Sequence, residues 1–383
     1  MPEVAIIGTG MIPVGEHWNK SLRELAAEAI HTALDDAKVY KPDALYVGNA
    51  FGSAFTSQSH LGALIADFAG LRGIEAFSVD AADASGGAAL RTAVLAIRSG
   101  LVETAVVVGA EKSSDAIAEA RVEARSVALD ADFESVHGAT LPALAALLMR
   151  RYMHAYGLGL RAFEGFSINA HANGKRNPYA MYRSTVREGA FAAAPMVADP
   201  VSLFDSAPDA DGAAALVITS AERAREQEHN PVHIIGSAVA TDAFALQSRE
   251  DLLFLDAAAR SIRAVLQQAG IEKEAVDLFE LHDAFTILSV LTLEAAGYAE
   301  RGEGWQMVNE IGLSGSLPIS TFGGLKSRGN PVGATGVYQA VEATLQLRGE
   351  AGDNQIENAQ IAMIQNLGGI SSTAITHILR ADT

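Results

Sequence analysis

The chain of 383 residues contains no cysteine. This absence excludes disulfide bonds, metal sites built on thiolates and every mechanism that depends on a cysteine nucleophile. It is compatible with a reducing compartment, and we expect a cytoplasmic protein. Aromatic residues make up only 6% of the chain, so we do not expect a site that holds bases or sugars by extensive aromatic stacking.

Basic residues are also scarce. The chain has 28 Lys and Arg against 46 Asp and Glu, which gives a formal net charge of −18 at pH 7. This charge argues against nucleic acid or an anionic membrane surface as a partner, because both are polyanions. A local basic pocket for an anionic ligand is still compatible with it.

Long apolar runs are missing as well. No stretch approaches the about 20 residues that span a bilayer, so no membrane segment is expected. The first residues enter a strand directly, without the basic and apolar regions of a signal peptide. His137 and His171 have no partner at metal-ligand spacing, and we predict no metal site.

The sequence does contain short apolar runs that alternate with amphipathic helical stretches, the pattern of an α/β protein. Hydrophobic residues make up 49% of the chain, and its length suits two lobes that each have a core. The pattern predicts strands over 4–7, 44–47, 105–108, 232–235 and 277–281, and helices over 21–37, 90–98, 141–156 and 255–269. Ser21 and Glu24 form a capping box at the first of these helices.

Two pairs of segments indicate an internal duplication. Residues 43–51 parallel residues 277–285, and a second match, offset by 247 residues (330 − 83), pairs Gly86 with Gly333 and Ala93 with Ala340. The alternative is chance similarity in a chain rich in alanine and glycine. The duplication predicts two layered halves that meet face to face, one formed by 1–111 and 196–230 and the other by 231–383. Residues 112–195 are interpreted as an inserted loop domain over the face where the halves meet, although their helices could belong to the core of the first half.

Seven motifs are arranged in order along the chain. They are Ala-Asp-Ala-Ser-Gly-Gly (82–87), Val-Gly-Ala-Glu-Lys (108–112), Asn-Pro-Tyr-Ala (177–180), Asp-Ala-Asp-Gly-Ala-Ala-Ala (209–215), His-Asp-Ala-Phe (282–285), Gly-Gly-Leu-Lys-Ser-Arg-Gly-Asn-Pro-Val-Gly-Ala-Thr-Gly (323–336) and Asn-Leu-Gly-Gly (366–369). In these motifs the chain resembles the thiolase superfamily, and within it the sterol-carrier-protein-type thiolases and their archaeal relatives. The resemblance implies the thiolase fold, with duplicated βαβαβαββ halves in five αβαβα layers and an inserted loop domain. It further implies a homodimer and a coenzyme A thioester as substrate, with no permanently bound cofactor.

The chain departs from that family at the residues that perform its chemistry. In the family a cysteine at a helix N-terminus forms a thiolate, which the helix dipole and free N–H groups stabilise, and this thiolate takes the acyl group from coenzyme A. Asp83 stands at that place. Asn330 replaces the histidine of the family's Gly-His-Pro motif, and Ala284 stands where the sterol-carrier type places an acid/base cysteine. Acyl transfer through cysteine is therefore not available by the usual route.

The resemblance implies that His282, Asp83 and Asn330 are the catalytic residues around the pocket. Asp83 either caps the helix that follows it or serves as a carboxylate base, with burial raising its pKa and the helix N-terminus lowering it. His282 would act as an oxyanion donor or acid/base, whereas Asn330 can donate a hydrogen bond but carries no proton at neutral pH. Near the oxyanion site the resemblance implies Gly368, Gly369 and Asn366.

Basic residues form two clusters in this acidic chain. They are either solvated surface residues or contacts for the coenzyme A phosphates. The candidate contacts are Lys175, Arg176, Arg183, Lys326 and Arg328.

The resemblance supports two main function hypotheses. The first is an acyl-CoA enzyme of the acyltransferase family that acts on the C–C bond next to a thioester by non-cysteine chemistry, such as retro-aldol cleavage. The family includes thiolase-like steroid side-chain aldolases that lack the nucleophile and work with a small OB-fold partner. The alternative is a degenerate thiolase-like protein that binds acyl-CoA or scaffolds a partner. Acyl transfer through Ser85 is disfavoured, since this serine lies two residues past the expected position and has no paired base.

Overall fold

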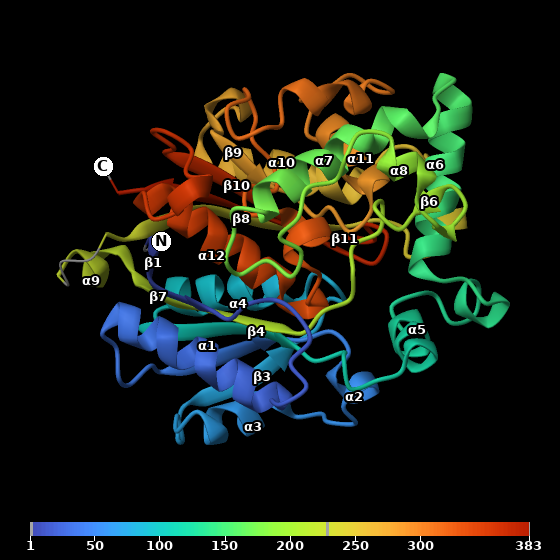
Figure 1. The fold of residues 1–383 in the computed structure, drawn as a ribbon. Helices are drawn as coiled ribbons and strands as arrows, with labels where there is room; N and C mark the ends of the chain where they lie inside the picture. The colour runs from blue at the N-terminus through green and yellow to red at the C-terminus, as the bar shows by residue number, and fades with distance from the viewer. Residues whose placement is uncertain (1–2, 227–229, 383) are drawn as a thin grey trace.

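The structure of the protein is a computed structural model that describes residues 3–226 and 230–382 (Figure 1). Residues 1, 2, 227–229 and 383, which fall in the predicted segments 1–111, 196–230 and 231–383, lie outside the described residues. The first half contains β1 (Val4–Met11), α1 (Leu22–Ala37), β2 (Ala44–Gly48), α2 (Gly52–Phe55), α3 (Leu61–Phe68), β3 (Glu75–Val79), α4 (Ser85–Ser99), β4 (Thr104–Glu111), β7 (Gly212–Ser220) and α9 (Ala221–Arg225). The segment between β4 and β7 contains α5 (Ala118–Ser126), α6 (Leu141–Tyr156), α7 (Glu164–Gly174), α8 (Ala190–Ala193), β5 (Met196–Ala198) and β6 (Val201–Ser202). The second half contains β8 (Val232–Thr241), α10 (Asp256–Ala269), β9 (Leu278–Glu280), α11 (Thr286–Ala295), α12 (Thr335–Arg348), β10 (Ile361–Gly368) and β11 (Thr373–Ala381).

The strand order supports the internal duplication. The hydrogen-bonded order is β3-β2-β4-β7-β1-β8-β11-β10-β9, so the run β2-β4-β7-β1 is mirrored by β9-β10-β11-β8. The strand directions repeat as well, because β2 pairs with β4 and β9 with β10 in parallel, while the other pairs within each run are antiparallel. A short antiparallel contact between β1 and β8, over Val4 to Ile6, joins the two halves.

Five layers follow from which faces of the strands are buried. Figure 1 shows α1 and α3 on the outside of the first half, with α4 and α12 between the two sets of strands. One core joins apolar residues of α4 and α12 to strands of both halves, including Leu90, Val341, Val107 and Ile364. A second core packs α1 and α3 against the outer face of the first half. This αβαβα arrangement confirms the predicted fold class.

The two central helices meet at their N-termini through glycines. A Cβ atom on Gly86 would come within 2.8 Å of the Gly333 oxygen, and one on Gly336 within 2.4 Å of the Gly87 nitrogen. Gly86 and Gly333 are equivalent positions in the predicted duplication. Close backbone contact at this crossing therefore requires glycine, and it brings the turns that precede both helices to one place.

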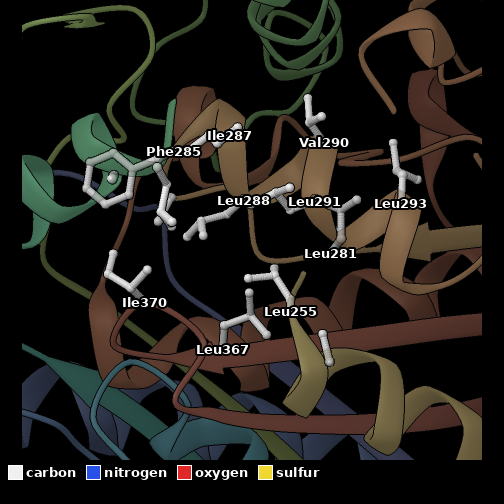
Figure 2. Packing of buried hydrophobic residues seen from close by; sticks show 14 of the residues in the cluster. Leu255, Leu281, Phe285, Ile287, Leu288, Val290, Leu291, Leu293, Leu367 and Ile370 are labelled. Carbon is white, nitrogen blue, oxygen red and sulfur yellow. The ribbon is translucent and has the colours of Figure 1, made fainter. Parts of the chain in front are cut away.

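The segment between β4 and β7 packs mainly on the second half. Leu144, Leu148 and Tyr152 of α6 share a core with α10, α11 and the end of β10. Figure 2 shows this core, where Leu367 and Ile370 lie with residues of α11. Because α6 and α7 cover its outer side, α11 is buried on nearly every face. Helices α6 and α7 thus pack on the second half, whereas Ala124 of α5 shares a small core with Phe51 and Phe55 of the first half.

Nearly all the predicted elements form close to their predicted bounds. The largest differences are β8, which continues to Thr241 rather than ending at residue 235, and α4, which begins at Ser85 rather than at residue 90. The glycines of α4 pack against α12, and this tertiary contact outweighs their poor helix propensity. Within the described residues, no helix is long and apolar enough to cross a membrane.

Candidate functional site

Asp83 lies in the tight turn between β3 and α4. Ala82 has a left-handed backbone with φ of 51°, and the Ser85 hydroxyl stabilises the turn by accepting from the Ala81 N–H at 2.9 Å and donating to the Ala82 oxygen at 2.6 Å. Ser85 is fully buried, so these bonds give it a structural role. Asp83 is the second residue before α4 and makes no side-chain cap to it.

The Asp83 carboxylate is held by an arginine from α5. Arg125 Nη2 lies 3.2 Å from Asp83 Oδ1, and its Nη1 pairs with Asp209 Oδ1, in the loop before β7. One guanidinium is therefore shared by two carboxylates that are 126 residues apart in sequence (209 − 83). The Asp83 side chain is only 3% exposed, and its Oδ2 has no hydrogen-bond partner among the described residues.

Two opposing effects set the acidity of Asp83. Burial raises the pKa of this carboxyl above its ordinary value, while Arg125 and the N–H groups of Asp83 and Gly369 act to lower it. Gly369 follows the end of β10 with φ of 59°. Its neighbour Gly368 lies so close to the turn that a Cβ there would come within 2.5 Å of the Ala81 oxygen. The two predicted loop glycines thus pack against the turn that carries Asp83.

His282 is a buried, neutral hydrogen-bonding group. It follows β9, is 1% exposed, and its Nδ1 lies 3.1 Å from the Asn366 amide nitrogen. The Asn366 oxygen accepts from the Gly87 N–H at 3.2 Å, so the amide nitrogen is the donor to Nδ1 and the ring proton is on Nε2. Burial, followed by the charges of Arg125 and Arg328, lowers the pKa of His282 to about 4. At neutral pH this histidine can donate a hydrogen bond to an oxyanion.

The Asn330 side chain is anchored in the turn before α12. Its Oδ1 accepts from the Val332 N–H and the Thr335 hydroxyl, both at 3.1 Å, which fixes the side chain at the start of α12. The residue lines a cavity of about 400 Å³. Because Oδ1 is occupied by the turn, Nδ2 is the group left to meet a ligand.

The cavity lies between the first half, the second half and the segment between them. Ala284 and Phe285 of the His-Asp-Ala-Phe motif line it together with Arg125 and Asp209. Its other lining residues are Val122, Ser126, Thr140, Leu141, Pro142, Val197, Ser206, Ala207 and Asn330. The structure thus brings Asp83, His282, Asn330 and Asn366 to one region, with Asn330 at the cavity wall and Asp83 behind Arg125.

The five predicted phosphate contacts divide into two groups. Lys175, Arg176 and Arg183 are exposed on the segment that contains α7. Lys326 and Arg328 are buried: Lys326 donates to the Asp205 backbone oxygen, and Arg328 pairs with Glu342 at 2.6 Å, with both side chains 0% exposed. The charge of Arg328 is thus engaged inside the protein, whereas Lys326 also lines a second cavity, of about 280 Å³, with His171 and Tyr182.

Arg125 and Asp209 are site residues that sequence reasoning missed. Arg125 lies in a polar stretch with no motif around it. Asp209 was visible as the first residue of the Asp-Ala-Asp-Gly motif, and that motif placed it near the site without indicating a role. Only the fold brings these two charges together.

Comparison with known proteins fits this architecture. A model of the thiolase N-terminal domain matches residues 4–189, and one described as thiolase C-terminal domain-like matches residues 238–381. The chain belongs to the thiolase family. It is 39% identical over 382 residues to the acetyl-CoA acetyltransferase of Methanothermobacter thermautotrophicus, covering 99% of both chains. It is 28% identical to human sterol carrier protein 2, covering 97% of this chain and 71% of that protein.

A solved structure supports the fold. The structure titled "Ltp2-ChsH2(DUF35) aldolase" superposes with a TM-score of 0.87 at 24% identity, covering 99% of this chain and 98% of the other. Thiolases of this family act on coenzyme A thioesters as acyl-CoA acyltransferases. The present member contains no cysteine, so an acyl-enzyme on cysteine is not available to it.

Proposed function

We propose that this thiolase-family protein acts on the C–C bond next to a coenzyme A thioester without forming an acyl-enzyme, in the manner of a retro-aldol cleavage. The observation that carries the proposal is the pairing of Asp83 with Arg125 beside a cavity lined by Asn330, together with a neutral His282 that Asn366 holds in place. An ion-paired, buried carboxylate is no acceptor for an acyl group. Neutral donors such as Asn330 and His282 suit a thioester oxygen that gains negative charge when the C–C bond breaks.

The direct test is to incubate the protein with 3-hydroxyacyl-CoA thioesters of different chain length and follow the products by mass spectrometry. The proposal predicts a carbonyl compound and a shorter acyl-CoA in equal amounts, with no acyl group on the protein. Exchange of label between acetyl-CoA and free coenzyme A would instead indicate acyl transfer, and it would contradict the proposal.

A homodimer is proposed from the exposed edge of the sheet. Strand β3 ends the hydrogen-bonded order, and Phe77 on it is 43% exposed. Such an unpaired edge with an apolar side chain is a template for pairing with a second copy. Light scattering after gel filtration should give twice the chain mass of 40.0 kDa, and a Phe77→Lys variant should shift the population toward the monomer.

A small OB-fold partner is proposed as well. The solved structure with the same fold is titled as an aldolase of two named components, and the present chain exposes apolar side chains between α5 and α6. They include Val127, Phe133 and Val136, which are 65–67% exposed, as expected for an interaction surface. Cleavage assays with and without an added OB-fold protein, together with gel filtration of the mixture, test this proposal.

A second candidate function is acyl-CoA binding without turnover. The observation that favours it is the isolation of Asp83, whose side chain is 3% exposed and lies behind Arg125. This candidate predicts calorimetric binding of an acyl-CoA with no cleavage product under any condition of the assay above.

A further inference from the structure

Among the residues that line the cavity, Arg125 and Asp209 carry the only full charges at neutral pH. They come from α5 and from the loop before β7, and they pair with each other. Asp83 also pairs with Arg125 but does not line the cavity. A carboxylate that a substrate can reach is therefore supplied by Asp209.

The two aspartates differ in access. The side chain of Asp209 is 27% exposed, against 3% for Asp83. Arg125 takes Oδ1 of Asp209, and within residues 3–226 and 230–382 no other side-chain hydrogen bond to this carboxylate is formed. Its second oxygen is therefore available to a ligand in the cavity.

Asp209 also lies beside Asn330. The backbone N–H of Asn330 donates to the backbone oxygen of Pro208 at 3.0 Å, and the backbone N–H of Ala210 donates to the backbone oxygen of Asn330 at 3.3 Å. Asp209 and Asn330 therefore form a short parallel β-bridge. Both residues line the same cavity. Asp209 as a proton acceptor and Asn330 as a hydrogen-bond donor to an oxyanion thus lie next to each other, as general base catalysis with charge stabilisation requires.

We infer that Asp209 is the general base of the C–C cleavage and that the substrate is an acyl-CoA with a hydroxyl group on the β-carbon; this inference rests on the function proposed above. Asp209 takes the hydroxyl proton, the C–O bond becomes a carbonyl, and the bond between the α- and β-carbons breaks. The electron pair passes to the thioester as an enolate, whose oxygen accepts from the Asn330 amide. The proton on Asp209 then returns to the α-carbon, so that one ketone or aldehyde and one shorter acyl-CoA leave without any co-reactant.

The proton transfer between Asp209 and the α-carbon also predicts a second reaction, which can be tested without knowing the group attached to the β-carbon of the substrate. By microscopic reversibility, Asp209 also removes an α-proton from the product thioester. Acetyl-CoA incubated with the protein in D2O should therefore gain deuterium at its methyl group. Mass spectrometry measures this exchange directly.

The experiment compares the unchanged protein with Asp209→Asn, Asp209→Glu and a control, Asp35→Asn, whose side chain is exposed on α1. Cleavage of 3-hydroxyacyl-CoA, deuterium uptake by acetyl-CoA and calorimetric affinity for coenzyme A are measured for each. Asp209→Asn should lose about 100-fold or more in cleavage and in exchange, while its affinity for coenzyme A stays within about twofold. Asp209→Glu should recover part of both rates, and Asp35→Asn should match the unchanged protein.

The outcomes separate the two proposals. If the unchanged protein cleaves and exchanges but Asp209→Asn does both within threefold of its rate, Asp209 is not the base, while the proposed function stands. If Asp209→Asn loses affinity for coenzyme A in proportion to its rate, its role is structural and the inference is overturned. If the unchanged protein neither cleaves nor exchanges, the proposed function fails and the inference fails with it.

Discussion

Arg125 holds Asp83 through a contact of 3.2 Å between Nη2 and Oδ1, although the two residues are separated by 42 positions in the chain. The contact joins the turn before α4 to α5, which otherwise packs on little more than α2. It also compensates the charge of a nearly buried carboxylate next to the cavity. The ion pair with Arg125 thus explains how the carboxylate of Asp83 can be buried in the turn before α4.

Removing Arg125 should therefore destabilise the protein. Arg125→Met keeps much of the volume but leaves Asp83 without its counter-charge, and we expect a loss of about 3 kcal/mol in the free energy of unfolding at pH 7. Adding Asp83→Asn to Arg125→Met should recover much of that loss, because no uncompensated charge stays buried. Urea unfolding of both single variants and the double variant measures the coupling. A single variant that loses under 1 kcal/mol would show that the ion pair is unimportant for stability.

Gly336→Ala should disrupt the crossing of the central helices. A Cβ there would lie 2.3 Å from Asn366 Oδ1 and 2.4 Å from the Gly87 nitrogen, so backbone must shift, and the cost should be about 2 kcal/mol or more. The change should also displace the amide that orients His282. Gly159→Ala is the matched control, since its Cβ would meet nothing within 4 Å. Equal melting temperatures for the two variants would be inconsistent with close packing at the crossing.

Buried histidines should make the protein sensitive to acid. The pKa values of His282 and His377 are lowered to about 4, mainly by burial. In the unfolded chain they return to about 6.5, so the unfolded state binds more protons between pH 6.5 and pH 4. The contribution of each histidine to the free energy of unfolding is thus present in full above pH 6.5 and falls as the pH drops toward 4. Between pH 7 and pH 5 the loss is about 2 kcal/mol for each histidine.

The difference between the unchanged protein and His377→Asn isolates this effect from the carboxyl groups. Denaturant unfolding at pH 7 and pH 5 should show a smaller loss of stability for the variant, whereas the exposed His154→Asn should follow the unchanged protein. An identical pH dependence for all three proteins would mean that these histidines do not titrate as their burial implies.

The exposed basic residues provide a test of coenzyme A binding. If Lys175 and Arg183 contact its phosphates, the double variant Lys175→Glu/Arg183→Glu should weaken calorimetric binding about tenfold or more, since charge-assisted hydrogen bonds contribute about 1.5–3 kcal/mol each. The double variant Lys41→Glu/Arg263→Glu, at two exposed positions, controls for the same change in net charge. An equal loss of affinity in both proteins would assign the effect to long-range charge, and no loss in either would place the phosphates elsewhere.

The sequence was sufficient for the layers but not for the charged centre. Apolar periodicity located β4 and α6 within a few residues, and the duplication around Gly86 and Gly333 anticipated the mirrored strand order. The burial of Arg328 was not foreseen, because its partner Glu342 lies 14 residues further on, on the inner side of α12. Arg125 was missed for a similar reason: both of its partners are distant in sequence, and only tertiary packing removes its charge from water.

The most direct test of the account is to supply a 3-hydroxyacyl-CoA to the purified protein and identify the products by mass spectrometry. Retro-aldol cleavage with Asp209 as the base should give equal amounts of a carbonyl compound and a shorter acyl-CoA, an unmodified protein, and loss of both products in Asp209→Asn. Label exchange between acetyl-CoA and coenzyme A, or intact substrate bound without any product, would contradict it.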